Sequence, residues 1–222
     1  GRIMHQQIAI DSDSDFTREN GVVGGSGTPD DPYVIQGWDI EVPPSGRGIS
    51  IEGTFAHFIV RDVAIHVDAG EEGASPGVGV LLDSISTGIV EDIHVDLEGV
   101  KYTRGKGIEV TSSENVVLRR NHVNNGDDGI RINSSSGIIV ELNTIHLGYD
   151  GVFLADNSEH NEVRDNSIIN VEWRGITLWS NSGNNFVEGN LIAGAGGFGI
   201  YLLFPDANIL SDNTIWRSAG GL

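Results

Sequence analysis

Residues 124–154 read NNGDDGIRINSSSGIIVELNTIHLGYDGVFL, and this stretch contains its own repeat. The triplet Asp128-Gly129-Ile130 returns as Asp150-Gly151-Val152 after 22 residues, and Asn121 returns as Asn143 at the same spacing. Self-similarity with a fixed period of about 20–50 residues is typical of architectures in which one supersecondary unit stacks on the next. The stretch therefore predicts a stack of similar rungs.

The same repeat extends from residue 33 to the end of the chain. One series is a glycine followed by Ile or Val, at Gly48, Gly79, Gly107, Gly129, Gly151, Gly175 and Gly199. A second series is Trp38, Val63, Ile93, Asn121, Asn143, Asn166, Asn190 and Asn213, with Asn161, Asn185 and Asn208 five residues before three of its members. An aliphatic residue stands three residues before and two residues after each member of the second series. These aliphatic positions are the predicted core.

Within each repeat the apolar residues alternate with a period of two, as in Ile130-Arg131-Ile132, which indicates strands rather than helices. Three short strands per repeat, joined by Asn, Gly and Ser turns, leave no room for a helix. We predict an all-β parallel β-helix of about eight rungs, one for each member of the second series. Stacked asparagines at a bend can hydrogen-bond one another and tolerate the left-handed backbone of such bends.

The ends of the chain and the longer repeats depart from this pattern. Residues 1–32 are rich in Gly, Asp, Ser and Pro, and we predict that they form an N-terminal cap on the repeats of residues 33–222. Insertions at 68–77 and 96–106 are predicted to leave the coil as loops. The spacing of Asp11, Asp13 and Asp15 is that of the first ligands in a calcium-binding loop. Phe16 stands where the glycine of such a loop is expected, so a solvated turn is the alternative.

Composition excludes several classes of partner. The chain has 222 residues, no cysteine and a formal charge of −19, which repels nucleic acid phosphates and anionic lipid. Without cysteine, disulfides and thiolate metal sites are excluded. No apolar run approaches the ~20 residues of a membrane span. We therefore expect no nucleic acid partner and no membrane span.

The repeats resemble the right-handed parallel β-helix repeats of the pectin-lyase-like superfamily, in particular its NosD-type and CASH (carbohydrate-binding and sugar hydrolase) group. Residues 15–40, DFTRENGVVGGSGTPDDPYVIQGWDI, are similar to the start of archaeal β-helix surface proteins of that group. The resemblance implies a right-handed coil in an extracellular or cell-surface module. It also implies interaction with carbohydrate, with lyase or hydrolase activity as an open alternative. Because the superfamily carries many chemistries, the activity must be sought in the residues themselves.

Outward-facing residues of the glycine-led strands predict a polysaccharide site. Lys106, Asp128, Asp150 and Arg174 are expected to stack in one column. Two carboxylates one rung apart raise each other's affinity for a proton or a cation, which suits acid–base or calcium-assisted chemistry. The alternative is a salt-bridged column that holds the register of the rungs. The candidate catalytic residues are Asp127, Asp128, Asp150, Lys106, Arg131 and Arg174, with Ca²⁺ as the candidate cofactor.

Aromatic and histidine side chains extend the list of candidate binding residues. Aromatic rings grip sugars through their flat apolar faces, and the candidates near the same face are Tyr149, Phe153, Trp173, Trp179 and Tyr201. Shelter under a loop or a neighbouring subunit is the alternative role. His94 and His122 are equivalent residues of successive rungs, and with Asp96 they form a candidate metal site or an ordinary exposed polar column.

The last rungs predict a function of another class. Ile200, Leu202, Leu210 and Ile215 belong to them, and only WRSAGGL follows Ile215. An uncovered apolar rung is a template for another chain. The alternative function is therefore a non-catalytic module of a surface layer or filament, which forms a homo-oligomer or filament through its C-terminal rung.

Overall fold

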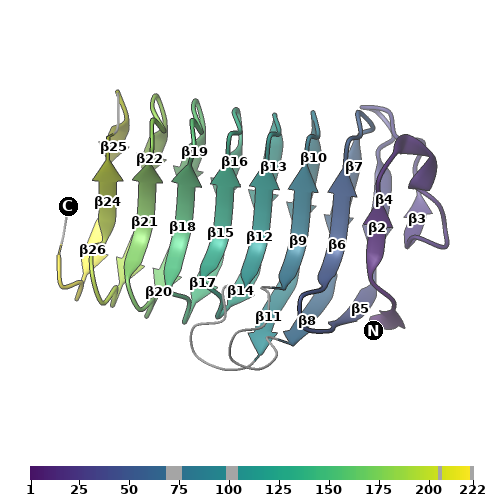
Figure 1. The fold of residues 1–222 in the computed structure, drawn as a ribbon, viewed down its shortest axis with the longest axis horizontal. Coiled ribbons are helices and arrows are strands. Elements are labelled where there is room, and N and C mark those ends of the chain that lie inside the picture. The colour runs from purple at the N-terminus through teal and green to yellow at the C-terminus, as the bar shows by residue number, and fades with distance from the viewer. Residues whose placement is uncertain (69–76, 99–104, 205–206, 221–222) are drawn as a thin grey trace.

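The computed structural model describes residues 1–68, 77–98, 105–204 and 207–220, and these residues form a solenoid of short β-strands (Figure 1). The only helical element among them is the 3-10 turn η1 (Asp13–Asp15). The all-β class and the parallel stacking predicted from the repeat are confirmed. Most of the two predicted insertions, 69–76 and 99–104, lies outside the described residues. No helix in the described part is long and apolar enough to cross a membrane.

Three sheets run along the stack, and each strand pairs in parallel with its equivalent one turn on. Sheet A contains β1 (Ile3–His5), β5 (Trp38–Val42), β8 (Ala64–Asp68), β11 (His94–Glu98), β14 (His122–Asn124), β17 (Thr144–His146), β20 (Ser167–Ile169), β23 (Leu191–Ala193) and β26 (Thr214–Trp216). Sheet B contains β2 (Ile8–Ile10), β6 (Arg47–Glu52), β9 (Val78–Asp83), β12 (Lys106–Thr111), β15 (Asp128–Asn133), β18 (Asp150–Ala155), β21 (Arg174–Trp179) and β24 (Ile200–Leu203).

Sheet C completes each turn. It contains β3 (Val22–Gly24), β4 (Tyr33–Gln36), β7 (Phe58–Arg61), β10 (Gly88–Glu91), β13 (Val116–Arg119), β16 (Ile139–Glu141), β19 (Glu162–Arg164), β22 (Phe186–Glu188) and β25 (Ile209–Ser211). Its first strand, β3, is antiparallel to β4. The predicted aliphatic columns fill the interior, as Ile130 of sheet B, Val140 of sheet C and Ile145 of sheet A show, each with no exposed surface. Alternation along each strand leaves the other side chains on three outer faces.

The recurring glycine has a steric cause. Successive glycines stack in sheet B, where the backbone of one rung closely approaches the next. A Cβ atom on Gly151 would lie 2.6 Å from Ile168 Cγ2 and closer still to the carbonyl oxygen of Gly175. Both values are below the separation that a real Cβ atom tolerates, so only glycine fits at this corner of the rung.

The asparagine ladders form as predicted. Asn143 Oδ1 accepts a hydrogen bond from Asn121 N at 2.9 Å, and Asn143 Nδ2 donates to Asn166 Oδ1 at 3.0 Å. The shorter series behaves in the same way, since Asn185 Oδ1 accepts from Asn161 N at 2.8 Å. One detail differs from the prediction. The left-handed backbone falls on the residue before the ladder, such as Leu142 with φ of 56°, because the asparagine itself continues into the next strand.

Residues 1–32 pack on the first rungs. Strands β1 and β2 extend sheets A and B, and Phe16 and Val22 are buried in the core. The Phe16 ring stacks on Tyr33 with centroids 4.5 Å apart. Within the calcium-like motif, Asp15 Oδ2 accepts from Ser12 Oγ at 2.8 Å in the turn, and Asp13 Oδ1 accepts from Thr54 Oγ1. This arrangement agrees with the solvated-turn alternative. The self-association predicted for the C-terminal rung stays a prediction.

Candidate functional site

The outer face of sheet B carries the predicted column of charged residues. Strand pairing aligns Lys106 with Asp128, Asp128 with Asp150, and Asp150 with Arg174. The four residues come from β12, β15, β18 and β21, which lie side by side along the stack (Figure 1). The register predicted from the repeat is therefore confirmed, and the question becomes how these charges are paired.

Asp128 is a buried carboxylate that is paired along its own strand. Its side chain is almost fully enclosed, at 2% exposure, and Oδ2 accepts a hydrogen bond from Arg131 Nη1 at 2.9 Å. Burial raises the pKa of Asp128 to about 6, because the charged form loses solvation. The pair with Arg131 opposes this rise, whereas the negative charges of Asp127 and Asp150 add to it.

Asp150 is paired with the next rung. Its Oδ1 accepts from the backbone N of Arg174 at 3.0 Å and from Nε at 3.1 Å, while Oδ2 accepts from Nη2 at 2.6 Å. Burial raises the pKa of this carboxyl too, and Arg174 opposes the rise. The bidentate pair fixes the plane of the Arg174 guanidinium.

The predicted column is thus divided into separate ion pairs. Lys106 Nζ turns to Glu109 Oε1 at 2.6 Å within its own strand. Asp127 lies near enough to raise the pKa of both aspartates, and its backbone N donates to Gly105 O at 2.7 Å. Each cation on this column has a carboxylate partner. Such pairing is expected both for a salt-bridged column that holds the register of the rungs and for a binding site.

Aromatic rings surround Arg174. Its guanidinium carbon lies 5.3 Å from the ring centroid of Phe153, 5.9 Å from that of Trp179 and 5.4 Å from that of Tyr201. Arg131 lies over the Phe153 ring at 4.7 Å, and Phe153 is only 8% exposed. Phe153 therefore supports the two arginines and offers little surface to a ligand. Trp179, at 38% exposure, and half-buried Tyr201 remain accessible.

A second aromatic pair stands at the turn that leads into sheet B. Tyr149 and Trp173 occupy equivalent positions one rung apart, and their rings are nearly parallel at 20° with centroids 6.5 Å apart. Both side chains are exposed. Sheet B thus presents accessible rings on both sides of the Asp150–Arg174 pair.

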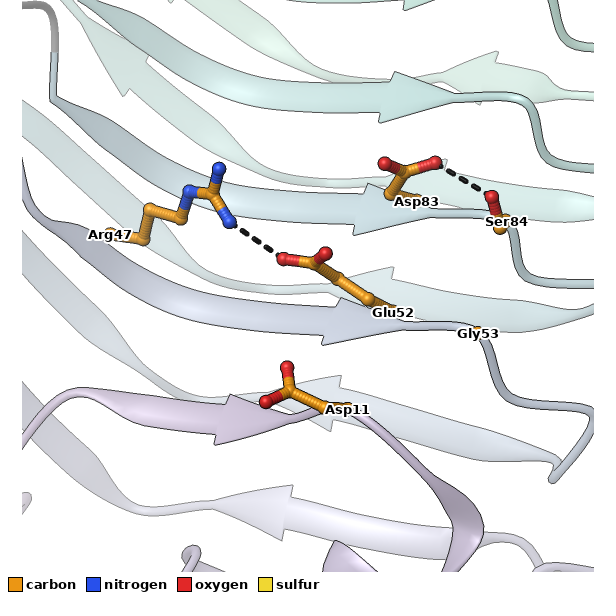
Figure 2. Close-up of a pocket in the computed structure, with 6 residues that line it drawn as sticks. All are labelled: Asp11, Arg47, Glu52, Gly53, Asp83 and Ser84. Atoms are coloured by element: carbon orange, nitrogen blue, oxygen red, sulfur yellow. Dashed lines mark hydrogen bonds and ion pairs between the residues drawn. The ribbon is translucent and has the colours of Figure 1, made fainter.

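A groove that the sequence did not single out lies at the N-terminal end of the same face (Figure 2). It is an open hollow of about 570 Å³. The lining residues are Asp11, Arg47, Glu52, Gly53, Asp83 and Ser84. Arg47 Nη1 pairs with Glu52 Oε1 at 2.6 Å, and Ser84 Oγ donates to Asp83 Oδ1 at 2.9 Å. The sequence feature that could have indicated this groove is the acidic pair Glu52 and Asp83, which are equivalent outward residues of successive rungs.

The predicted histidine site lies on sheet A. His94 and His122 pair across β11 and β14, and their rings stack at 5.0 Å with only 9° between their planes. Asp96 Oδ2 lies 3.0 Å from His94 Nε2, and Asp96 Oδ1 accepts from Asn124 Nδ2 at 2.7 Å. Burial lowers the pKa of His122, and the neighbouring His94 lowers it further. The structure brings the three predicted residues together, with their imidazoles stacked face to face.

Comparison with known proteins decides the family. The model described as periplasmic copper-binding protein (NosD) matches residues 85–222. This chain belongs to the NosD family. Among solved structures it is similar to the periplasmic alginate epimerase AlgG, with 17% identity and a TM-score of 0.52, over 96% of this chain and 69% of that one. It is also similar to endo-xylogalacturonan hydrolase from Aspergillus tubingensis, with 9% identity and a TM-score of 0.50, over 99% and 94% of the two chains.

These structural likenesses show the fold alone, since their identities are low. No curated protein matches the chain. In this NosD-family chain the matched segment contains the whole predicted charge column, the accessible aromatic rings and the histidine stack. All six residues that line the open groove of Figure 2 precede that segment.

Proposed function

We propose that the chain is a glycan-binding module that holds its ligand on the outer face of sheet B, over β18, β21 and β24. The observation that carries this proposal is the group of Trp179, Arg174 and Tyr201, in which two accessible rings flank a guanidinium fixed by Asp150. Aromatic rings stack on the C–H faces of sugars, and a guanidinium donates planar hydrogen bonds to hydroxyl or carboxylate oxygens. A flat solenoid face suits an extended chain better than a small molecule.

Two of the matched proteins are named for polysaccharide chemistry, an alginate epimerase and a xylogalacturonan hydrolase, which agrees with a glycan ligand. The family description and the name of the epimerase both refer to periplasmic proteins, which supports a location of this module in the periplasm or at the cell surface.

The ion pairs favour binding over catalysis. A general acid must reach the bond it protonates, and its pKa should lie near the working pH. Asp128 has a suitable pKa of about 6, yet it is 2% exposed and its Oδ2 is occupied by Arg131. Asp150 is equally enclosed beneath Arg174. We infer that both aspartates position arginines, and that Asp127 and Lys106 set the local charge.

Copper, named in the family description, does not fit the histidine stack of the matched segment. The lone pair of an imidazole nitrogen lies in the plane of its ring. Two rings that are parallel to within 9° and stacked at 5.0 Å direct those lone pairs along parallel lines rather than toward one point. The Asp96 carboxylate also already contacts His94 and Asn124. We therefore derive no role for copper at His94, His122 and Asp96.

The test is glycan binding by affinity electrophoresis and calorimetry, with alginate and polygalacturonate as acidic polymers and xylan as a neutral one. We expect Trp179→Ala to weaken binding of the preferred polymer at least tenfold, because a sugar stacks on the flat apolar surface of the tryptophan ring. The matched control is Trp216→Ala, which removes another exposed tryptophan, at 56% exposure, from sheet A. Equal loss in both variants, or no binding by the parent to any polymer, would contradict the proposal.

A further inference from the structure

Three metal-ligating side chains converge on the outer face of sheet A, far from the aromatic rings of sheet B. Asp39 and Glu41 lie two residues apart on β5, on either side of the buried Ile40, so both point outward. His66 of β8 pairs directly with Glu41, and the residue opposite Asp39 is the small Ala64. The register thus places two carboxylates and one imidazole around a single point.

The distances within this group suit a bound ion. One ligand atom from each of Asp39, Glu41 and His66 can be chosen so that all lie within 4.8 Å of one another, the only such group among the described residues. His66 Nε2 and Asp39 Oδ1 are 3.3 Å apart. Ligands bonded at about 2.0–2.1 Å to a tetrahedral Zn²⁺ are separated by roughly 3.3 Å, as the geometry requires. Two of the three ligands therefore already stand at coordination distance from each other.

A second observation points to a cation as the ligand of this group. Asp39 Oδ1 is shielded from solvent and makes no hydrogen bond, although the side chain as a whole is partly exposed. His66 Nε2 is close enough to form an ion pair with it when the imidazole is protonated, but the two atoms make no hydrogen bond. A shielded carboxylate oxygen without a donor is costly, and a cation placed between it and the imidazole removes that cost.

We propose that Asp39, Glu41 and His66 bind a divalent transition-metal ion of borderline softness, of which Zn²⁺ is the type. An imidazole suits Zn²⁺ and its neighbours in the series, whereas Ca²⁺ and Mg²⁺ prefer oxygen ligands throughout. Three protein ligands leave one position for water or for an external ligand. The site lies outside residues 85–222, so it is separate from the segment that matches the family, and it does not depend on the glycan proposal.

The experiment is a calorimetric titration of chelator-treated protein with Zn²⁺, repeated with Ca²⁺. We expect one Zn²⁺ per chain, little binding of Ca²⁺, and at least a tenfold loss of Zn²⁺ affinity in His66→Gln. His146→Gln is the matched control, because His146 is an outward histidine of the same sheet, on β17, and should leave Zn²⁺ binding unchanged. Titration with Co²⁺ gives an independent readout, a visible absorption band that His66→Gln should abolish.

Several outcomes would overturn the proposal. These are no Zn²⁺ binding by the parent, equal affinity in His66→Gln and the parent, and a loss of affinity in His94→Gln that His66→Gln does not show. The last result would place the metal at the histidine stack instead. Melting curves without metal establish that each variant folds. If His66→Gln does not fold, Glu41→Gln, which changes an exposed ligand, replaces it in the test.

Discussion

Replacing Asn143 with alanine should destabilise the protein by about 2–4 kcal/mol, because the side chain links three consecutive rungs. Asn143 Oδ1 accepts from Asn121 N, and Nδ2 donates to Leu118 O, both at 2.9 Å. Asn121 and Leu118 are fully buried, so water cannot easily replace the lost partner. Each unsatisfied buried group costs about 1–3 kcal/mol, and partial relaxation of the bend reduces the sum of the two.

The measurement is urea unfolding, followed by circular dichroism, with the free energy of unfolding taken from the midpoint and the slope. Asn133→Ala is the control, since Asn133 is a half-buried residue of the outer face of sheet B and should cost about 0.5 kcal/mol or less. If the two variants unfold at the same urea concentration, or Asn143→Ala costs under about 0.5 kcal/mol, the ladder does not stabilise the bend as argued.

Three other changes test the fold and the site. Gly151→Ala should cost about 3 kcal/mol in urea unfolding through overpacking, whereas Gly24→Ala, where an added Cβ meets nothing within 4 Å, should be nearly neutral. Leu142→Gly should stabilise by up to about 1 kcal/mol, because it relieves a left-handed backbone at an exposed leucine, and a lower melting temperature would contradict this. Burial raises the pKa of Asp128 to about 6, so ionisation of Asp128 costs native stability as the pH rises from about 4 through 6. Across that range the free energy of unfolding of Asp128→Asn should increase relative to that of the parent as the pH rises. A difference that stays constant or changes in the opposite direction would contradict the assignment.

The repeat spacing was enough to predict the strands, the register and both asparagine ladders, because each depends on which residues are equivalent from rung to rung. Spacing could not show how the charges pair. Strand pairing sets Lys106 opposite Asp128, yet Lys106 donates to Glu109 of its own strand. A long flexible side chain can reach several carboxylates, so the register alone does not determine its partner. Nor could an outward position reveal that two guanidinium groups cover Phe153.

The Asp39–Glu41–His66 group could not be predicted from the sequence for a different reason. The repeat places Glu41 and His66 in equivalent positions, each three residues after a member of the second series, Trp38 or Val63. Asp39, by contrast, stands opposite Ala64, so the register alone does not bring it to His66. Only the side-chain geometry shows that His66 Nε2 lies 3.3 Å from Asp39 Oδ1.

The Asp39–Glu41–His66 group and the glycan site at Trp179, Arg174 and Tyr201 should act independently. They lie on different sheets, and four turns separate β8 from β20, the sheet A strand that precedes β21, which is about 20 Å at roughly 4.8 Å per turn. Coupling between sites requires an element with two arrangements whose equilibrium both ligands shift, and a tightly stacked aliphatic interior resists such rearrangement. We therefore expect the affinity for the preferred polymer to be the same with saturating Zn²⁺ as after chelation, in the parent and in His66→Gln alike. Because coupling is reciprocal, a change in glycan affinity with Zn²⁺ must be matched by an equal change in Zn²⁺ affinity with glycan. Observing that matched pair of shifts would refute independence and would make the solenoid itself a transmitter between its faces.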